Sequence, residues 1–142
     1  MPPDTVERKL PVLKDPSLLR QQCYVDGHWC DADGGRTMDV VNPATGRAIG
    51  TAPIMGGDET RRAIGAAARA FPGWAAKTAK ERGVVLRRWF ELITLNVDDL
   101  ALILTSEQGK PLAESKGEVT LGAAYVEWFA EEARRVYGDV IP

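Results

Sequence analysis

Few side chains in this sequence are suited to act as nucleophiles, general bases or metal ligands. Cys23 and Cys30 are the two cysteines, and His28, the single histidine, lies between them. This set has too few ligands for a zinc site, and no carboxylate cluster has metal-ligand spacing. Neither cysteine has a base at a spacing that would activate its thiol. We therefore interpret Cys23 and Cys30 as structural strand residues and His28 as a surface residue.

Two further patterns could in principle bind or transform a ligand. Gly56-Gly57 precedes a helical pattern, and a helix N-terminus can bind phosphate. Asp58 and Glu59 already bring negative charge to that end, which disfavours a phosphate site. The consecutive residues 131 and 132, both glutamate, point about 100° apart on a helix and do not converge on one substrate. The residues alone therefore predict no catalytic, cofactor-binding or metal-binding residue.

A predicted hairpin over residues 23–30 positions the cysteines and the histidine. Asp26-Gly27 is a preferred pair for a two-residue type I′ turn. That turn places Val25 opposite His28, with the pairs 24/29 and 23/30 following in register. The two cysteines become a hydrogen-bonded cross-strand pair with Cα atoms ~5.5 Å apart. This separation permits a disulfide, but a reducing setting opposes one, so we expect both thiols to stay reduced.

Other turn and strand signals flank this hairpin. Residues 1–16 contain four prolines and no periodicity, which indicates an extended tail. Ser17 is a candidate cap for a short helical turn over 18–20. Residues 37–41 and 48–54 read as two strands joined by the turn 42–46, which makes a second hairpin.

Helical patterns follow the two hairpins. Residues 58–71 form a short, alanine-rich helix that Pro72-Gly73 should end, with one packing face made of Ile64, Ala67, Ala68 and Phe71. Thr78 and Glu81 form a capping box for a helix that reaches about Leu95. Asn96 is the predicted cap of a shorter helix, which ends at the Gly109-to-Pro111 signal. Pro111 also suits the first turn of the next helix.

The longest predicted helix spans residues 114–138 and carries two apolar rows. One row is Leu121, Tyr125, Trp128, Phe129, Ala133 and Val136, and the other is Val119, Gly122, Val126, Ala130 and Tyr137. A helix this apolar needs cover on more than one side. Gly138 is the predicted C-terminal glycine, and Glu131 with Arg135 is a predicted ion pair.

Composition places the chain among ordinary globular proteins. Its 142 residues include 44% hydrophobic and 27% charged residues, with a net charge of −2.

Residues 61–90 hold eight basic residues against one acid, and residues 91–132 hold nine acids against two lysines. Because the charges cancel and no aromatics interleave with the basic residues, two facing helical layers are favoured over a nucleic-acid patch. No apolar run approaches a membrane span of about 18 residues. We expect a cytoplasmic protein without a nucleic-acid or membrane partner.

Six segments of the sequence resemble the N-terminal part of an aldehyde dehydrogenase. They are VDGHW (25–29), VVNPATG (40–46), GDET (57–60), TAKERGVVLRRWF (78–90), EQGKPLAESKGEV (107–119) and EWFAEEARRVYGDVIP (127–142). The segments KGEV and EWFAEEARR are most similar to the succinate-semialdehyde dehydrogenase branch.

This resemblance implies an α/β parent fold and oxidation of an aldehyde by NAD⁺ or NADP⁺, in a homo-oligomer (dimer or tetramer). The implied substrate is a small aldehyde, succinate semialdehyde, which becomes succinate. In such enzymes a cysteine thiolate attacks the carbonyl and a glutamate activates the water that releases the acid. By resemblance, Gly117 and Leu121 line the substrate tunnel, and Glu107 lies near a monovalent cation.

The chain departs from the family's pattern because it ends at Pro142. Residues 17–142 match the first part of the NAD(P)-binding domain: an α+β piece with two hairpins and about four helices. The parallel nucleotide-binding sheet, the nucleotide turn and the catalytic cysteine and glutamate would all follow later. We therefore expect this chain alone to bind no cofactor and to be inactive, with Leu121, Tyr125, Trp128 and Phe129 forming a bare apolar patch. The alternatives are a truncated, non-catalytic paralogue that binds a protein through the 114–138 helix, or the product of a truncated reading frame.

Overall fold

The computed structural model describes residues 11–139 and 141. A short 3₁₀ turn, η1 (Pro16–Leu18), precedes two hairpins, β1 (Cys23–Val25) with β2 (His28–Cys30) and β3 (Thr37–Val41) with β4 (Ala48–Pro53). Four helices follow: α1 (Gly57–Ala75), α2 (Ala79–Leu95), α3 (Val97–Gln108) and α4 (Leu112–Glu132). The predicted order of two hairpins and four helices is confirmed.

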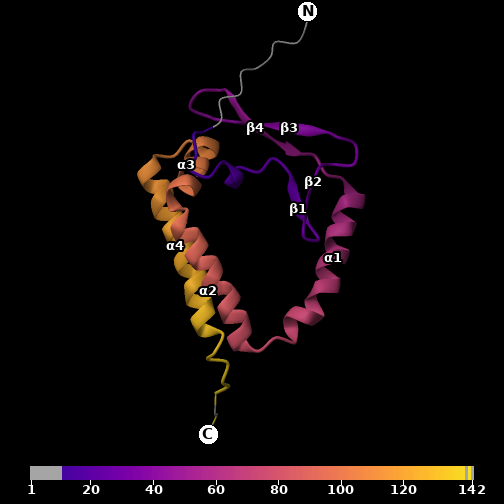
Figure 1. Cartoon of the computed structure of the whole chain (residues 1–142), viewed down its shortest axis with the longest axis vertical. Helices are drawn as coiled ribbons and strands as arrows, with labels where there is room; N and C mark the ends of the chain where they lie inside the picture. Colours follow the sequence, from indigo (N-terminus) through magenta and orange to yellow (C-terminus); the bar gives the residue numbers. More distant parts are fainter. Residues whose placement is uncertain (1–10, 140, 142) are drawn as a thin grey trace, which may run out of the picture.

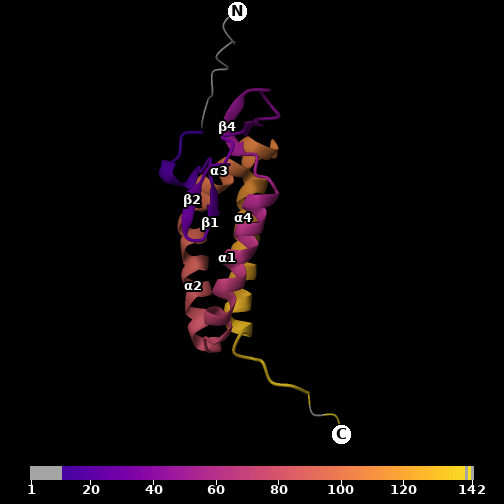
Figure 2. The same ribbon diagram turned by 90° about the vertical axis from the view of Figure 1, so that its right-hand side faces the viewer.

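The molecule has two arms that are joined at one end by the α1–α2 connection and bridged at the other end by the hairpins. Figure 1 shows α1 as one arm and the pair α2 and α4 as the other, with α3 and both hairpins at the end opposite the α1–α2 connection. The view in Figure 2 shows α2 and α4 running alongside each other for most of their length. Helix α3 packs mainly on α4. Both sheets are two-stranded and antiparallel.

The first hairpin has the predicted turn and register. Asp26 and Gly27 have φ values of 52° and 82°, as a type I′ turn requires. Cys23 pairs with Cys30, and both are free and half-buried. The rings of Tyr24 and Trp29 lie 5.0 Å apart between centroids, so this cross-strand pair stabilises the outer face of the hairpin.

The capping box of α2 is also confirmed. The Thr78 hydroxyl accepts from the Glu81 backbone N–H, and the Glu81 carboxylate accepts from the Thr78 N–H at 2.7 Å. The bonds that the Glu81 carboxylate accepts from the Thr78 backbone N–H and hydroxyl lower the pKa of Glu81. At the other end of α2 the prediction for Asn96 is wrong in its mechanism. Its amide donates to the Leu92 carbonyl at 2.9 Å and so closes α2, instead of capping α3.

Two predicted helix ends are wrong. Helix α1 runs through Pro72, because the Pro72 carbonyl accepts from the Ala76 N–H at 3.0 Å and sustains one further turn. Helix α4 ends at Glu132, and Gly138 does not take the left-handed conformation. The last buried residue of α4, Ala130, lies against Gly83 near the start of α2, so α4 has no partner helix beyond that point.

Two further local predictions are wrong. Glu132, rather than Glu131, pairs with Arg135 at 3.0 Å, because the chain leaves the helix there. In the N-terminal turn, the Asp15 carboxylate accepts from the Ser17 N–H at 2.9 Å, so Asp15 is the cap instead of Ser17.

The packed face of α1 differs from the predicted one. Ala66 is buried, and it lines a shallow hollow against β1 and the hairpin turn together with Ala63, Ala67 and Ala70. Ile64 and Phe71 are instead exposed. The hairpin can approach α1 closely only over side chains as small as alanine, so the larger residues face away.

The N-terminal segment crosses the start of α3. The Asp99 carboxylate, which is buried, accepts from the backbone N–H groups of Lys14 and Asp15 at 3.0 and 2.8 Å. Hydrogen bonds from Lys116 and Lys14 to the neighbouring Asp98 lower its pKa from 3.8 to about 2. The predicted tail thus makes ordered contacts at residues 14 and 15, while its first ten residues lie outside the described part.

Candidate functional site

One face of α4 is strongly apolar and open to solvent. Leu121, Tyr125, Trp128 and Phe129 are each about 60% exposed, and with Ala124 they line an open hollow of about 280 Å³. We call these five residues the α4 apolar face. The predicted patch is therefore confirmed in the described structure. Monomeric proteins rarely leave such contiguous aromatic surface uncovered, which makes this face a candidate contact surface.

The opposite side of α4 is packed, which explains why the apolar face is free. Ser115, Ala123 and Ala130 recur at helical spacing and are buried against α2 and α3. Their small size lets the helices approach closely, and the Ser115 and Thr105 hydroxyls hydrogen bond at 2.8 Å across the α3–α4 contact. A Cβ on Gly83 would lie 3.1 Å from the Ala130 carbonyl oxygen. The chain's own helices therefore cover one row of α4 and leave the other bare.

The two predicted tunnel residues lie on the exposed side of this helix. Gly117 precedes Leu121 by four residues, so both occupy the same side of α4. Leu121 is part of the α4 apolar face, and a Cβ added at Gly117 would meet nothing within 4 Å. The helix brings the two positions together at the N-terminal end of the apolar face. Glu107 is exposed in the last turn of α3.

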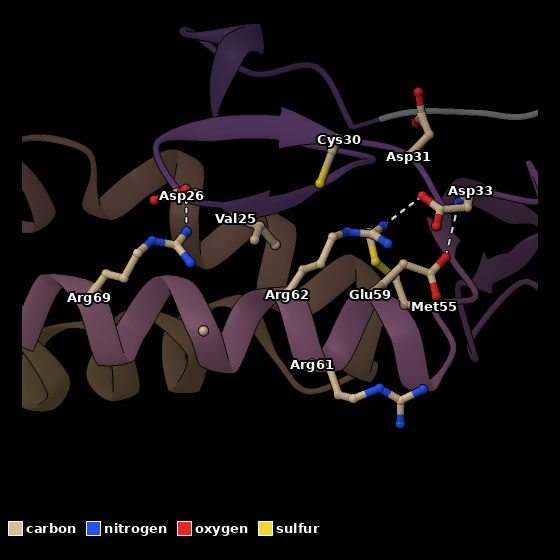
Figure 3. Close-up of a pocket in the computed structure, with 11 residues that line it drawn as sticks. Val25, Asp26, Cys30, Asp31, Asp33, Met55, Glu59, Arg61, Arg62 and Arg69 are labelled. Atoms are coloured by element: carbon tan, nitrogen blue, oxygen red, sulfur yellow. Dashed lines mark hydrogen bonds and ion pairs between the residues drawn. The ribbon is translucent and has the colours of Figure 1, made fainter.

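A second hollow, of about 600 Å³, lies between the β1–β2 hairpin and α1 (Figure 3). Two of its arginines pair with two of its aspartates. Arg62 contacts Asp33 at 2.6 Å, and Arg69 contacts Asp26 at 3.0 Å. The Arg62 pair raises the pKa of that guanidinium. These cross-element pairs tie the hairpin and the following loop to α1.

Glu59 occupies the N-terminus of α1, the position that the sequence analysis considered for a phosphate. Its carboxylate accepts from the backbone N–H groups of Asp33 at 2.9 Å and Gly56 at 2.6 Å. These two bonds lower the pKa of Glu59. The protein's own carboxylate thus serves as the anion at this helix end, in agreement with the expectation from the sequence.

The remaining candidates make no catalytic arrangement. His28 ends the hairpin turn and is exposed. Among residues 11–139 and 141, no group of three or more His, Cys, Asp or Glu side chains is placed to hold a metal ion. The basic segment 61–90 and the acidic segment 91–132 meet where α2 faces α4. There the side chains of Arg87 and Glu127 lie 2.6 Å apart. None of the described helices is long and apolar enough to cross a membrane.

Comparison with known proteins identifies the family of this chain. The family model for the aldehyde dehydrogenase family matches residues 29–142. The chain belongs to the aldehyde dehydrogenase family. It is 63% identical over 130 residues to glutarate-semialdehyde dehydrogenase of Pseudomonas putida, 56% identical to succinate-semialdehyde dehydrogenase [NADP(+)] of Escherichia coli, and 58% identical to 3-sulfolactaldehyde dehydrogenase of Pseudomonas putida. Each match covers 92% of this chain and 27% of the relative.

Solved structures contain the same fold. An aldehyde dehydrogenase from Brucella melitensis biovar abortus 2308 superposes with a TM-score of 0.91 at 60% identity, over 94% of this chain and 28% of that one. PnpE in complex with nicotinamide adenine dinucleotide superposes with a TM-score of 0.82 at 35% identity, over 87% and 26%. The chain thus corresponds to about a quarter of each relative, at the N-terminal end.

The described residues do not fit a dinucleotide by themselves. A dinucleotide site of the doubly wound type needs parallel strands that lead into helix N-termini. Both described sheets are antiparallel hairpins, and the N-terminus of the first helix after them is occupied by Glu59. We therefore derive no catalytic step from this segment.

Proposed function

We propose that residues 17–142 are the N-terminal part of the NAD(P)-binding domain of an enzyme that oxidises succinate semialdehyde to succinate, with residues 1–16 as a tail. The observation that carries this proposal is the 56–63% identity over 130 residues to dehydrogenases of small semialdehydes. The working enzyme would use NADP⁺ or NAD⁺, assemble as a homo-oligomer and act in the cytoplasm.

The substrate class follows from chemistry that the relatives' substrates share. Glutarate and succinate semialdehydes carry a carboxylate at the end opposite the aldehyde, and 3-sulfolactaldehyde carries a sulfonate there. Each is therefore a short aldehyde with an anionic end. We assign the same class to the parent enzyme of this chain, with succinate semialdehyde as the substrate.

The role of this segment is structural, with one contribution to the substrate path. The α4 apolar face would pack on the remainder of the enzyme, which is about three quarters of a relative's length. At the edge of that contact, Gly117 and Leu121 would line the substrate tunnel. Their open surroundings support this role, because neither position is filled by the segment's own side chains.

A chimera tests the proposal. The matching N-terminal quarter of the Pseudomonas putida glutarate-semialdehyde dehydrogenase would be replaced by this chain, and reduction of NAD⁺ or NADP⁺ would be followed with succinate and glutarate semialdehydes. We expect a soluble, active chimera that accepts both substrates. A soluble chimera without activity, beside an active unmodified enzyme, would contradict the proposal and favour a protein-binding module that uses α4.

Two matched glycine variants in that chimera test the tunnel assignment. Gly117→Leu should lower kcat/KM on the order of tenfold or more by narrowing the tunnel. Gly122→Leu is the control, because a Cβ at Gly122 also meets nothing within 4 Å but lies away from Leu121 around the helix. Equal losses in the two variants would show a packing effect instead of a tunnel position.

A further inference from the structure

The two thiols of the first hairpin lie directly across from each other. Cys23 and Cys30 are register partners in β1 and β2, and both are free and half-buried. The Cys30 thiol donates a hydrogen bond to the Cys23 carbonyl oxygen at 3.4 Å. Side chains of directly opposed strand residues project from the same face of a sheet. The two sulfur atoms are therefore held on one side of the hairpin.

The Cys30 thiol is also accessible from the hollow between the hairpin and α1. Figure 3 shows its side chain projecting from β2 toward α1, and Cys30 is among the residues that line that hollow of about 600 Å³. A small polar oxidant can enter a space of this size. Reaction at Cys30 then takes place beside a second thiol that is already in register.

From this geometry we propose that Cys23 and Cys30 form a reversible redox pair that a hydroperoxide closes into a cross-strand disulfide. The Cys30 thiolate attacks one peroxide oxygen and becomes a sulfenic acid, while the O–O bond breaks and the other oxygen leaves as water or an alcohol. The Cys23 thiolate then attacks the Cys30 sulfur and displaces the hydroxide, which leaves as water. In total two thiols lose their protons and two electrons, and the peroxide is reduced.

The strand geometry also favours reopening of this bond. The two-residue turn makes Val25 and His28 a hydrogen-bonded pair, so the cysteine pair, two residues further along, is hydrogen-bonded as well. Cβ atoms in such pairs are about 5 Å apart, whereas a relaxed disulfide holds them ~3.8 Å apart. Closing the bond therefore strains the hairpin, and strained disulfides are the ones that cellular thiols reduce readily. The pair is reduced at rest and oxidised under peroxide.

Peptide mass analysis tests this pair in the full chain. Trypsin cleaves after Arg20 and Arg36 and leaves both cysteines in one peptide, residues 21–36. After the native protein is treated with hydrogen peroxide and residual thiols are blocked, this peptide should lose the mass of two hydrogen atoms. Dithiothreitol should restore both thiols.

Two variants show whether the register is responsible. In Cys23→Ser, Cys30 has no second thiol to react with, so the peptide should gain the mass of oxygen instead of losing the mass of two hydrogen atoms. A variant that combines Cys23→Ser with Gln22→Cys moves the second thiol one residue along the chain, out of register, and should form no intrapeptide bond. The proposal is overturned if the unmodified chain gains oxygen without losing hydrogen, if it forms only cross-linked dimers, or if the shifted variant closes as readily.

Discussion

Replacement of Gly109 by alanine should destabilise the fold at the contact between the end of α3 and the β3–β4 turn. Gly109 ends α3 with φ 84°, and an added Cβ would lie 2.7 Å from Cγ of Pro43 in the β3–β4 turn. The left-handed conformation costs a non-glycine residue about 1–2 kcal/mol, and overpacking adds about 1–3 kcal/mol. We therefore expect Gly109→Ala to lower the free energy of unfolding by about 2–5 kcal/mol.

Two control variants separate these costs. Gly46 has φ 68° and no neighbour within 4 Å of an added Cβ, so Gly46→Ala should show the conformational cost alone. Gly122 lies inside α4 in open space, and Gly122→Ala should stabilise the helix by about 0.5–1 kcal/mol. Urea unfolding followed by far-ultraviolet circular dichroism measures all three variants.

A double-mutant cycle with Pro43→Ala isolates the steric part. Removing the proline ring should recover about 1–3 kcal/mol of the Gly109→Ala loss, because the atom nearest the new methyl group is then absent. Two results would refute this reasoning: a Gly109→Ala loss no larger than that of Gly46→Ala, and a coupling energy of zero. Either would mean that the two turns do not meet as the structure places them.

Three further predictions concern α3 and α4. The double variant Trp128→Ser with Phe129→Ser should reduce self-association in analytical ultracentrifugation. Because both rings are exposed, it should change the free energy of unfolding by less than about 1 kcal/mol. A loss of about 3 kcal/mol per ring would instead place the rings in a core. The pKa of Asp98 is lowered from 3.8 to about 2, so its ion pairs stabilise the fold above pH 3.8 and that contribution is lost as the pH falls toward 2. Asp98→Asn should flatten this part of the stability–pH curve, and an unchanged curve would contradict the assignment. Asp99→Asn should cost about 1–3 kcal/mol in urea unfolding, because the amide NH2 replaces one of the two oxygens that accept from the backbone N–H groups. A neutral effect would show that the N-terminal segment is not held there.

The hairpins and the start of α2 were predictable because their signals are local. Asp26-Gly27 allows a two-residue turn with both φ values positive, and that turn alone sets the register of the cysteine pair. Thr78 and Glu81 satisfy each other's backbone donors within one helical turn. The exposed row of α4 was also foreseeable, because the sequence holds more apolar helix surface than its own elements can cover.

Other features depended on contacts between elements that are distant in sequence. The end of α4 at Glu132 reflects where α2 stops supporting it, while Gly138 had the local signature of a helix end. The packed face of α1 is the alanine side because the hairpin approaches it there, although Ile64 and Phe71 have the same periodicity. Asp99 binds a segment about 85 residues earlier, and no local pattern marks that pairing. Short-range backbone chemistry set the hairpin turns, the α2 capping box and the helix periodicity, whereas tertiary packing decided which apolar face is covered and where α4 ends.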